Sequence, residues 1–344
     1  MSGIIRVGVV LPETYWADEE WKNAEPALAY ADEAGKEGVQ LLVFPEGYPG
    51  PMTGPLQPKE LSSKPIEALQ EKARQHGMYI AAGDVEENPG IPETHFLTLK
   101  FISPEGELLA RYLRVQPDTP PLNAYLYNGK AHLLPGRETK VIETSLGNIG
   151  LRICSELFVP ELCRISMLHG TDILIAPVHG RHSRTMFNSF QMSDTWRCIA
   201  RARAAENLYY VIVTHNIYRI AGSISKGHLG AFVAGPERMI ATRGKAGLLV
   251  TDLDLERLAY LRSRNYDEEN LSQPAEGIEP LGCRPGQIWE RDPTVYAELA
   301  QPHKYSYNYY YFNDNLDKWI EQYETIYGGK YAEIQRRYGK LQFK

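Results

Sequence analysis

The chain has 344 residues, of which 43% are hydrophobic, and it carries a formal net charge of -6. This length is enough to bury a large core in one or two domains, and the mild acidity argues against a nucleic-acid partner. Residues 1–6 lack the apolar region of a signal peptide, and no run reaches the roughly 18 apolar residues of a membrane span. The four cysteines include no Cys-x-x-Cys pair, so we expect a cytoplasmic protein with no disulfide framework, no metal and no other cofactor.

The first part of the chain alternates apolar strands with amphipathic helices. Apolar, β-branched runs predict strands over residues 4–11, 39–44 and 79–84. Helical spacing predicts helices over residues 17–38 and 65–76. Pro26 marks either a kink in the first helix or its true start. This order predicts an α/β fold with parallel neighbouring strands.

Two hairpins follow, and the second half then repeats the alternation. Strands over residues 94–103 and 107–114 flank one turn, and strands over 140–144 and 149–153 flank another. Further helices are predicted over residues 160–169, 187–207 and 255–262. Further strands are predicted over residues 172–176, 209–215, 230–234, 239–242 and 248–252. Two similar halves predict two sheets packed face to face with helices outside.

Three polar residues follow separate buried strands: Glu46, Arg114 and Cys154. In α/β sheets, the ends of strands are where sites form. A cysteine nucleophile needs a base, which Glu46 can supply, and a positive donor facing the oxyanion, which Arg114 can supply. Each residue alone has an ordinary alternative as an apolar filler, a helix cap or a salt-bridge partner. The occurrence of all three at strand ends favours a shared active site.

Two of these residues lie in motifs that resemble the nitrilase or carbon–nitrogen hydrolase superfamily. Residues 41–47 (Leu-Leu-Val-Phe-Pro-Glu-Gly) look like its glutamate motif, and residues 150–161, around Cys154, look like its cysteine motif. Residues 196–207 are similar to the helix that the family places before a strand. The resemblance covers roughly residues 3 to 265.

The resemblance implies a carbon–nitrogen hydrolase domain over residues 1–265, folded as a four-layer αββα sandwich of two mixed sheets. It implies a homodimer or a higher homo-oligomer. It also implies that a cysteine attacks an amide, that ammonia or an amine leaves, and that water hydrolyses the thioester. By motif, Glu46 and Cys154 carry over as catalytic residues, and the backbone N–H of Ser155 joins Arg114 in holding the oxyanion.

The family's catalytic lysine does not carry over. Its Tyr-Arg-Lys segment matches residues 112–114, which places Arg114 at the lysine position. Lys130 is an alternative, but it lies much closer to the cysteine in sequence than the family's lysine does. Arginine keeps the positive charge, but its planar fork is not interchangeable with an ammonium group. A glutamate that often follows the family's lysine has no counterpart in residues 118–125.

Four further residues are candidates for substrate binding. Tyr48 follows Glu46 in the same loop, and His179, Arg181 and His182 follow the strand predicted over residues 172–176. Arginine suits a bidentate contact with a carboxylate or phosphate. A structural loop at Tyr48 and a solvated surface loop at residues 179–184 are equally good explanations. A zinc site at the two histidines lacks a third ligand nearby in sequence.

These motifs predict an amidase acting on a small-molecule amide. The Cys-Ser-Glu sequence at Cys154 differs from the Cys-Trp-Glu typical of nitrilases, although a nitrilase that converts a nitrile to an acid and ammonia stays an alternative. Arg114 and the missing glutamate also leave open a non-hydrolytic relative. That relative would be an acyl transferase or a pseudoenzyme that binds a small molecule.

Residues 266–344 form a C-terminal extension of different character. Prolines interrupt its first part, and residues 305–312 read Tyr-Ser-Tyr-Asn-Tyr-Tyr-Tyr-Phe. So many aromatic rings need a place to be buried. We expect the extension to pack on its own subunit or on a neighbouring one.

Overall fold

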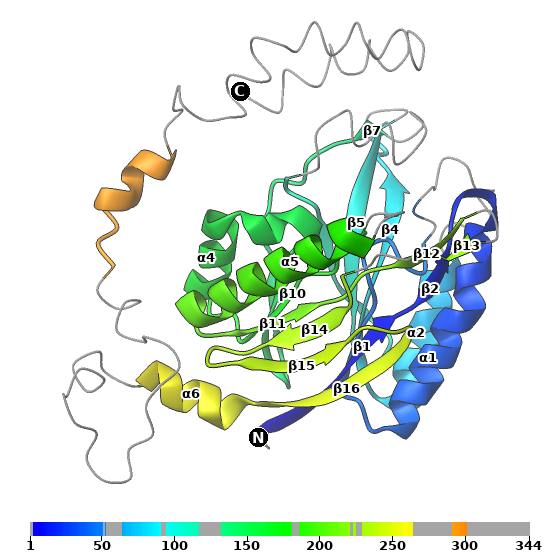
Figure 1. The fold of residues 1–344 in the computed structure, drawn as a ribbon, viewed down its shortest axis with the longest axis horizontal. Helices are drawn as coiled ribbons and strands as arrows, with labels where there is room; N and C mark the ends of the chain where they lie inside the picture. Colours follow the sequence, from blue (N-terminus) through cyan, green and yellow to red (C-terminus); the bar gives the residue numbers. More distant parts are fainter. Residues whose placement is uncertain are drawn as a thin grey trace, which may run out of the picture.

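The computed structural model describes residues 3–50, 52, 64–90, 94–116, 132–180, 186–220, 223–224, 229–263 and 291–300. Two large sheets lie face to face, with helices on their outer sides (Figure 1). The predicted elements of residues 4–263 are found close to their expected bounds.

The first sheet has seven strands in the order β16-β1-β3-β4-β5-β6, with β7 pairing with β5. Strands β1, β3 and β4 run parallel, whereas β16, β5 and β6 are antiparallel to their neighbours. The bounds of its strands are β1 Ile4–Leu11, β3 Leu41–Val43, β4 Tyr79–Glu87, β5 Thr94–Ile102, β6 Leu108–Leu113, β7 His132–Leu133 and β16 Gly247–Asp254. The predicted mixed α/β sheet is therefore present, with β6 at one edge.

The second sheet has six strands in the order β15-β14-β11-β10-β9-β8. The bounds of its strands are β8 Val141–Thr144, β9 Gly147–Leu151, β10 Ile173–Ile175, β11 Tyr210–Val213, β14 Ala231–Ala234 and β15 Met239–Arg243. A third, small sheet that the sequence did not predict joins β2 (Glu13–Tyr15), β12 (Ile217–Ile220) and β13 (Ser223–Ile224). Its strands have two to four residues each, which is too short for a periodic pattern.

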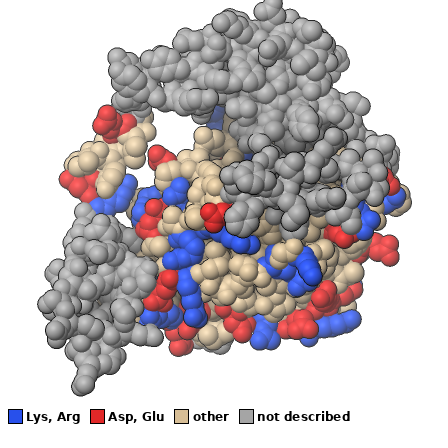
Figure 2. Space-filling view, viewed as in Figure 1, with Lys and Arg blue, Asp and Glu red and all other residues tan. Residues whose placement is uncertain are grey.

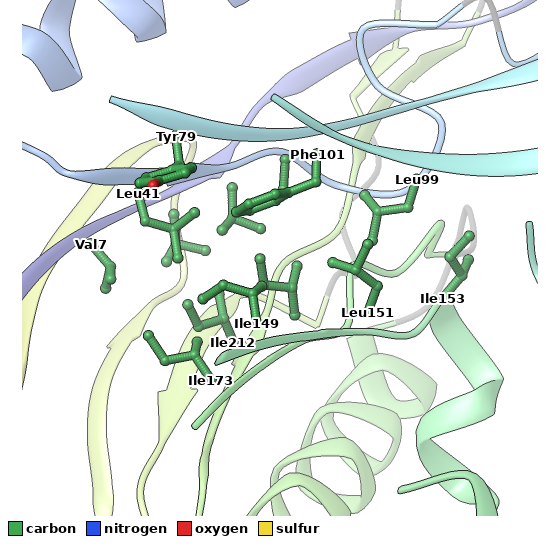
Figure 3. Close-up of a cluster of buried hydrophobic side chains, with 14 of the residues drawn as sticks. Val7, Leu41, Tyr79, Leu99, Phe101, Ile149, Leu151, Ile153, Ile173 and Ile212 are labelled. Carbon is green, nitrogen blue, oxygen red and sulfur yellow. The ribbon is translucent and has the colours of Figure 1, made fainter. Parts of the chain in front are cut away.

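The main core lies between the two large sheets. Val7, Leu41, Tyr79, Leu99 and Phe101 from the first sheet face Ile149, Leu151, Ile153, Ile173 and Ile212 from the second (Figure 3). These side chains are less than 10% exposed. Alternate residues of the same strands point outward, which leaves a second apolar face on each sheet.

Helices cover both outer faces. Helices α1 (Ala24–Lys36) and α2 (Lys64–His76) pack apolar residues such as Ala31 and Leu69 on the first sheet. Helices α4 (Pro160–Leu168) and α5 (Met186–Asn207) cover the second sheet through residues such as Cys163 and Ala200. Helix α6 (Leu255–Ser263) follows β16, and the 3-10 helix η5 (Val295–Ala300) lies in the C-terminal extension. The predicted αββα sandwich is confirmed.

The helix predicted over residues 17–38 is divided. A 3-10 helix, η1 (Ala17–Asn23), precedes α1, and α1 ends at Lys36. Pro26 lies in the first turn of α1, where a missing backbone N–H costs no hydrogen bond. Pro26 therefore marks the start of α1, which is one of the two alternatives that the sequence left open.

Basic and acidic side chains are interspersed over the described part of the face in Figure 2. Among the described residues, no helix is both long and apolar enough to cross a membrane.

Candidate active site

Glu46 lies just beyond β3, in the loop that leaves the first sheet. Its carboxylate is 2% exposed and accepts hydrogen bonds from two distant segments of the chain. The Arg114 guanidinium donates to Oε1 over 3.2 Å, and the backbone N–H of His179 donates to Oε2. The Glu46 carbonyl in turn accepts a hydrogen bond from the Asn216 side chain at 3.0 Å. Residues from both large sheets therefore fix this acid in one position.

Cys154 occupies a sharp turn at the end of the second sheet. It begins the 3-10 helix η4 (Cys154–Phe158), directly after β9, and its φ of 54° lies in the left-handed region. A residue other than glycine seldom adopts this conformation, and such residues are concentrated at functional sites. The Cys154 N–H donates to the carbonyl of Pro177 at 2.8 Å, which ties the turn to the segment after β10. The side chain is half-buried.

Arg114 follows β6 and joins the acid to the cysteine turn. One terminal nitrogen of its guanidinium contacts Glu46, and the other donates to the Ser155 hydroxyl at 2.6 Å. Its side chain is 3% exposed. The predicted residues Glu46 and Arg114 are thus in direct contact, and Arg114 also contacts the residue that follows Cys154.

Glu156 supports the segments that carry Arg114 and Cys154, and the sequence did not identify it as a site residue. Its carboxylate is fully buried and accepts four hydrogen bonds. The donors are the backbone N–H groups of Val115, Gln116 and Ile153 and the hydroxyl of Tyr112, at 2.7–2.9 Å. Burial raises the pKa of Tyr112, which keeps its hydroxyl protonated as a donor. One carboxylate therefore connects the residues that flank Arg114 to the residue before Cys154.

Tyr48 does not have the surroundings expected of a substrate-binding residue. It is fully buried and belongs to the apolar cluster between the first sheet and helices α1 and α2. Its ring stacks on Phe44 at 5.6 Å, and its hydroxyl donates to the carbonyl of Asn23. The Tyr48 side chain therefore packs in the outer core, and its assignment to substrate binding stays a prediction.

His179 contributes its backbone amide to Glu46, and its ring is engaged elsewhere. The ring nitrogens lie 2.8 and 3.0 Å from the Tyr218 hydroxyl, and Trp16 packs edge-on against the ring at 5.3 Å. Asn216 donates to the His179 carbonyl as well as to that of Glu46. Tyr218 and Asn216 come from β12 and the segment before it, so the unpredicted small sheet supports the acid.

Arg181, His182 and Lys130 lie outside the described residues. Within the part of the chain that the structure describes, no group of three His, Cys, Asp or Glu side chains is arranged to hold a metal ion.

The model of the carbon-nitrogen hydrolase family matches residues 6–263. The chain belongs to the carbon–nitrogen hydrolase family. The resemblance seen in the motifs around Glu46 and Cys154 is confirmed by this match, which covers most of the chain and both large sheets.

Curated relatives of this carbon–nitrogen hydrolase include amidases. It is 24% identical over 250 residues to the omega-amidase NIT2 of Homo sapiens, covering 70% of this chain and 86% of the relative. It is 28% identical over 255 residues to the deaminated glutathione amidase of a Synechocystis strain, covering 71% of this chain and 90% of the relative.

Among solved structures, an amidase from Nesterenkonia sp. matches with a TM-score of 0.60 at 22% identity. The match covers 76% of this carbon–nitrogen hydrolase and 94% of the amidase. At this identity the likeness shows a shared fold. It supports the αββα architecture independently of the sequence motifs.

Proposed function

We propose that this carbon–nitrogen hydrolase is a thiol amidase that releases ammonia or an amine from a small amide. The contact of Arg114 with both Glu46 and Ser155 carries the proposal, because it joins an acid and a cation beside the Cys154 turn. The family match and the amidase relatives support the reaction class.

In the proposed reaction, Glu46 takes the proton of the Cys154 thiol as the sulfur attacks the carbonyl carbon of the amide. The carbonyl oxygen becomes an oxyanion, which the Arg114 guanidinium and the backbone N–H of Ser155 stabilise. Glu46 then gives its proton to the leaving nitrogen, and the C–N bond breaks to leave a thioester. Water, deprotonated by Glu46, cleaves the thioester to a carboxylic acid and restores the thiol.

The surroundings of Glu46 suit this role. Because the carboxylate is almost fully buried and held from two sides, its position is defined before substrate arrives. The left-handed turn at Cys154 places a residue other than glycine in a conformation that is concentrated at functional sites, which supports the proposed role of its thiol.

A trapping experiment tests the proposal. A solved mutant of the Nesterenkonia amidase, in which glutamine replaces a glutamate, shows covalent addition of the acetamide moiety of fluoroacetamide at the active site cysteine. We expect fluoroacetamide to add one acetamide group to Cys154 of this chain, detected by intact-protein and peptide mass spectrometry. Cys154→Ala provides the control. Absence of the adduct on Cys154, together with no ammonia release from a panel of small amides, would contradict the proposal.

A non-hydrolytic relative is the second candidate, and Arg114 at the family's lysine position is the observation that favours it. An acyl transferase would pass the acyl group from Cys154 to an amine, and a pseudoenzyme would only bind. Thioester formation without release of the free acid, followed by acyl transfer when hydroxylamine is added, would favour the transferase. Release of acid and ammonia in equal amounts favours the amidase.

A further inference from the structure

A groove of about 980 Å³ lies along the edges of the two large sheets. Its walls come from β6 and β8, which are the edge strands of the two large sheets. Apolar side chains line it from both strands, namely Leu109, Ala110, Leu113, Val141 and Ile142. Charged side chains are also present, namely Arg111, Arg137, Glu138, Lys140 and Glu143. An apolar lining accompanied by polar groups suits amphipathic side chains such as tyrosine.

The outer edge of β6 presents backbone groups to this groove. The Arg114 N–H donates to the Leu97 carbonyl of β5, and backbone groups alternate in direction along a strand. Arg111 and Leu113 therefore point their amide groups away from β5. Within the described residues, no strand pairs with this edge. An edge of this kind is a template for another strand.

One end of the groove is closed. Gly136 donates its N–H to the Arg114 carbonyl, and a Cβ added at Gly136 would lie 2.3 Å from the Leu113 carbonyl oxygen. Only glycine allows the backbone to approach β6 so closely there. The edge available for pairing therefore extends from Arg111 toward Leu108, which is 45% exposed.

The C-terminal extension contains a segment with strand periodicity. Tyrosines occupy residues 305, 307, 309 and 311, so four rings share one face of an extended strand. Tyrosine is among the residues most favoured in strands, and this segment contains no proline or glycine. The segment can supply the backbone groups that β6 lacks and the rings that fit the groove.

We propose that residues 305–312 dock in the groove as an added strand beside β6 of the same polypeptide. Ser263, at the end of α6, is joined to residue 305 by 41 residues, of which Val295–Ala300 form the 3-10 helix η5. The other 35 could extend over roughly 115 Å, far more than the size of the domain requires. Because the segment is tethered, its effective concentration at the groove is in the millimolar range. The same chain therefore competes well against a second copy. The proposal is independent of the catalytic proposal.

Amide hydrogen exchange of the full chain, compared with a chain ending at Ala300, tests the proposal. We expect the Arg111 amide, which points into the groove, to exchange at least about tenfold more slowly in the full chain. The Tyr112 amide points toward β5 and serves as the internal control, with equal protection in both proteins. Equal exchange of Arg111 in both proteins would overturn the proposal.

Matched substitutions test the strand periodicity. Tyr307→Asp places a charge on the tyrosine face, and Ser306→Asp places the same charge on the opposite face. We expect the first to abolish the protection of Arg111 and the second to retain most of it. Equal loss in both variants would contradict an added strand.

Cross-linking identifies which chain fills the groove. A photo-reactive phenylalanine analogue is placed at Leu109, and the protein is assembled from isotopically light and heavy chains. Cross-links from Leu109 to residues 305–312 within one isotopic form support the proposal. Mixed light–heavy cross-links would show that a second copy fills the groove, and cross-links only to other segments would show a different occupant. Either result would overturn it.

Discussion

Arg114 and Glu46, which are 68 residues apart in the sequence, form an ion pair with 3.2 Å between guanidinium and carboxylate. Both side chains are no more than 3% exposed. Arg114 also reaches the Ser155 hydroxyl, so the two terminal nitrogens of one planar group have different partners. A lysine ammonium at the same position carries its charge on one nitrogen and cannot make both contacts in the same geometry.

Arg114→Lys tests whether activity needs both guanidinium contacts, one to Glu46 and one to Ser155. We expect kcat/KM for the best amide substrate to fall at least tenfold, about 1.4 kcal/mol, because one of the two contacts is lost. Arg111→Lys is the matched control, since its side chain is 45% exposed, and we expect little change there. A tenfold gain for Arg114→Lys would instead indicate that arginine suppresses hydrolysis in this chain.

Glu156→Gln tests the four hydrogen bonds by which the Glu156 carboxylate holds the segments around Arg114 and Cys154. The amide NH₂ of glutamine would face donors that now bind a carboxylate oxygen, since all four partners of Glu156 donate. We expect the free energy of unfolding to fall by about 2–4 kcal/mol, measured by urea denaturation, and kcat to fall as well. Glu161→Gln on the exposed face of α4 is the control. Unchanged stability and kcat would show that the four hydrogen bonds do not position the site.

The two cysteines Cys163 and Cys198 should differ in reactivity. Burial raises the pKa of Cys163 to about 11, whereas Cys198 is exposed on α5. At pH 8 only about 0.1% of Cys163 is thiolate, and its sulfur is also inaccessible. We expect iodoacetamide to label Cys198 and leave Cys163 unlabelled in the native protein, as read by peptide mass spectrometry. Unfolding in guanidinium should remove the difference; equal labelling in the native state would contradict it.

The carboxylate of Asp32 on α1 makes pH-dependent ionic contacts with two side chains of α2. Its carboxylate accepts hydrogen bonds from Lys72 at 2.6 and 2.8 Å and contacts His76 at 2.8 Å, and these two partners lower its pKa. A lowered carboxyl pKa stabilises the folded state above the unfolded pKa, and this contribution is lost as the pH falls through the folded value. These contacts therefore stabilise the folded state at neutral pH, and their contribution is lost below the usual pKa range of an aspartate.

We expect Asp32→Asn to reduce the free energy of unfolding by less than about 1 kcal/mol at pH 7, because the carboxylate is partly exposed. The difference from the unsubstituted protein should shrink toward pH 3. Glu33→Gln, an equal charge change on an exposed neighbour, should show little effect at any pH. Urea denaturation from pH 7 to below the usual pKa range of an aspartate measures both variants, and a difference that does not shrink as the pH falls would contradict a stabilising role for the Asp32 carboxylate.

The main strands and helices could be predicted because burial imposes a period on the sequence. Strands such as β3 and β11 are continuous apolar runs, and the layers follow from the alternation of strands with helices. The small sheet was missed because β2 pairs with β12 about 200 residues away over only three residue pairs, and β12 pairs with β13 over only two. Local sequence periodicity does not reveal strand pairing that is so short or so distant in the chain.

The residues of the candidate site could likewise be predicted only in part. Glu46, Arg114 and Cys154 could be singled out because each follows an apolar run. Glu156 could not, because an acid two residues after the cysteine carries no sign that its carboxylate turns inward. The direction of a side chain after a turn was also not predictable, and for this reason the sequence left both a substrate-binding and a structural role open for Tyr48.

The left-handed backbone at Cys154 sets stability against activity at a single position. A side chain there costs roughly 1 kcal/mol that glycine would not. Random mutagenesis selected only for heat resistance should therefore recover Cys154→Gly, a protein that melts later and has lost its sulfur. The proposed use of the thiol in catalysis would account for a residue other than glycine at this position.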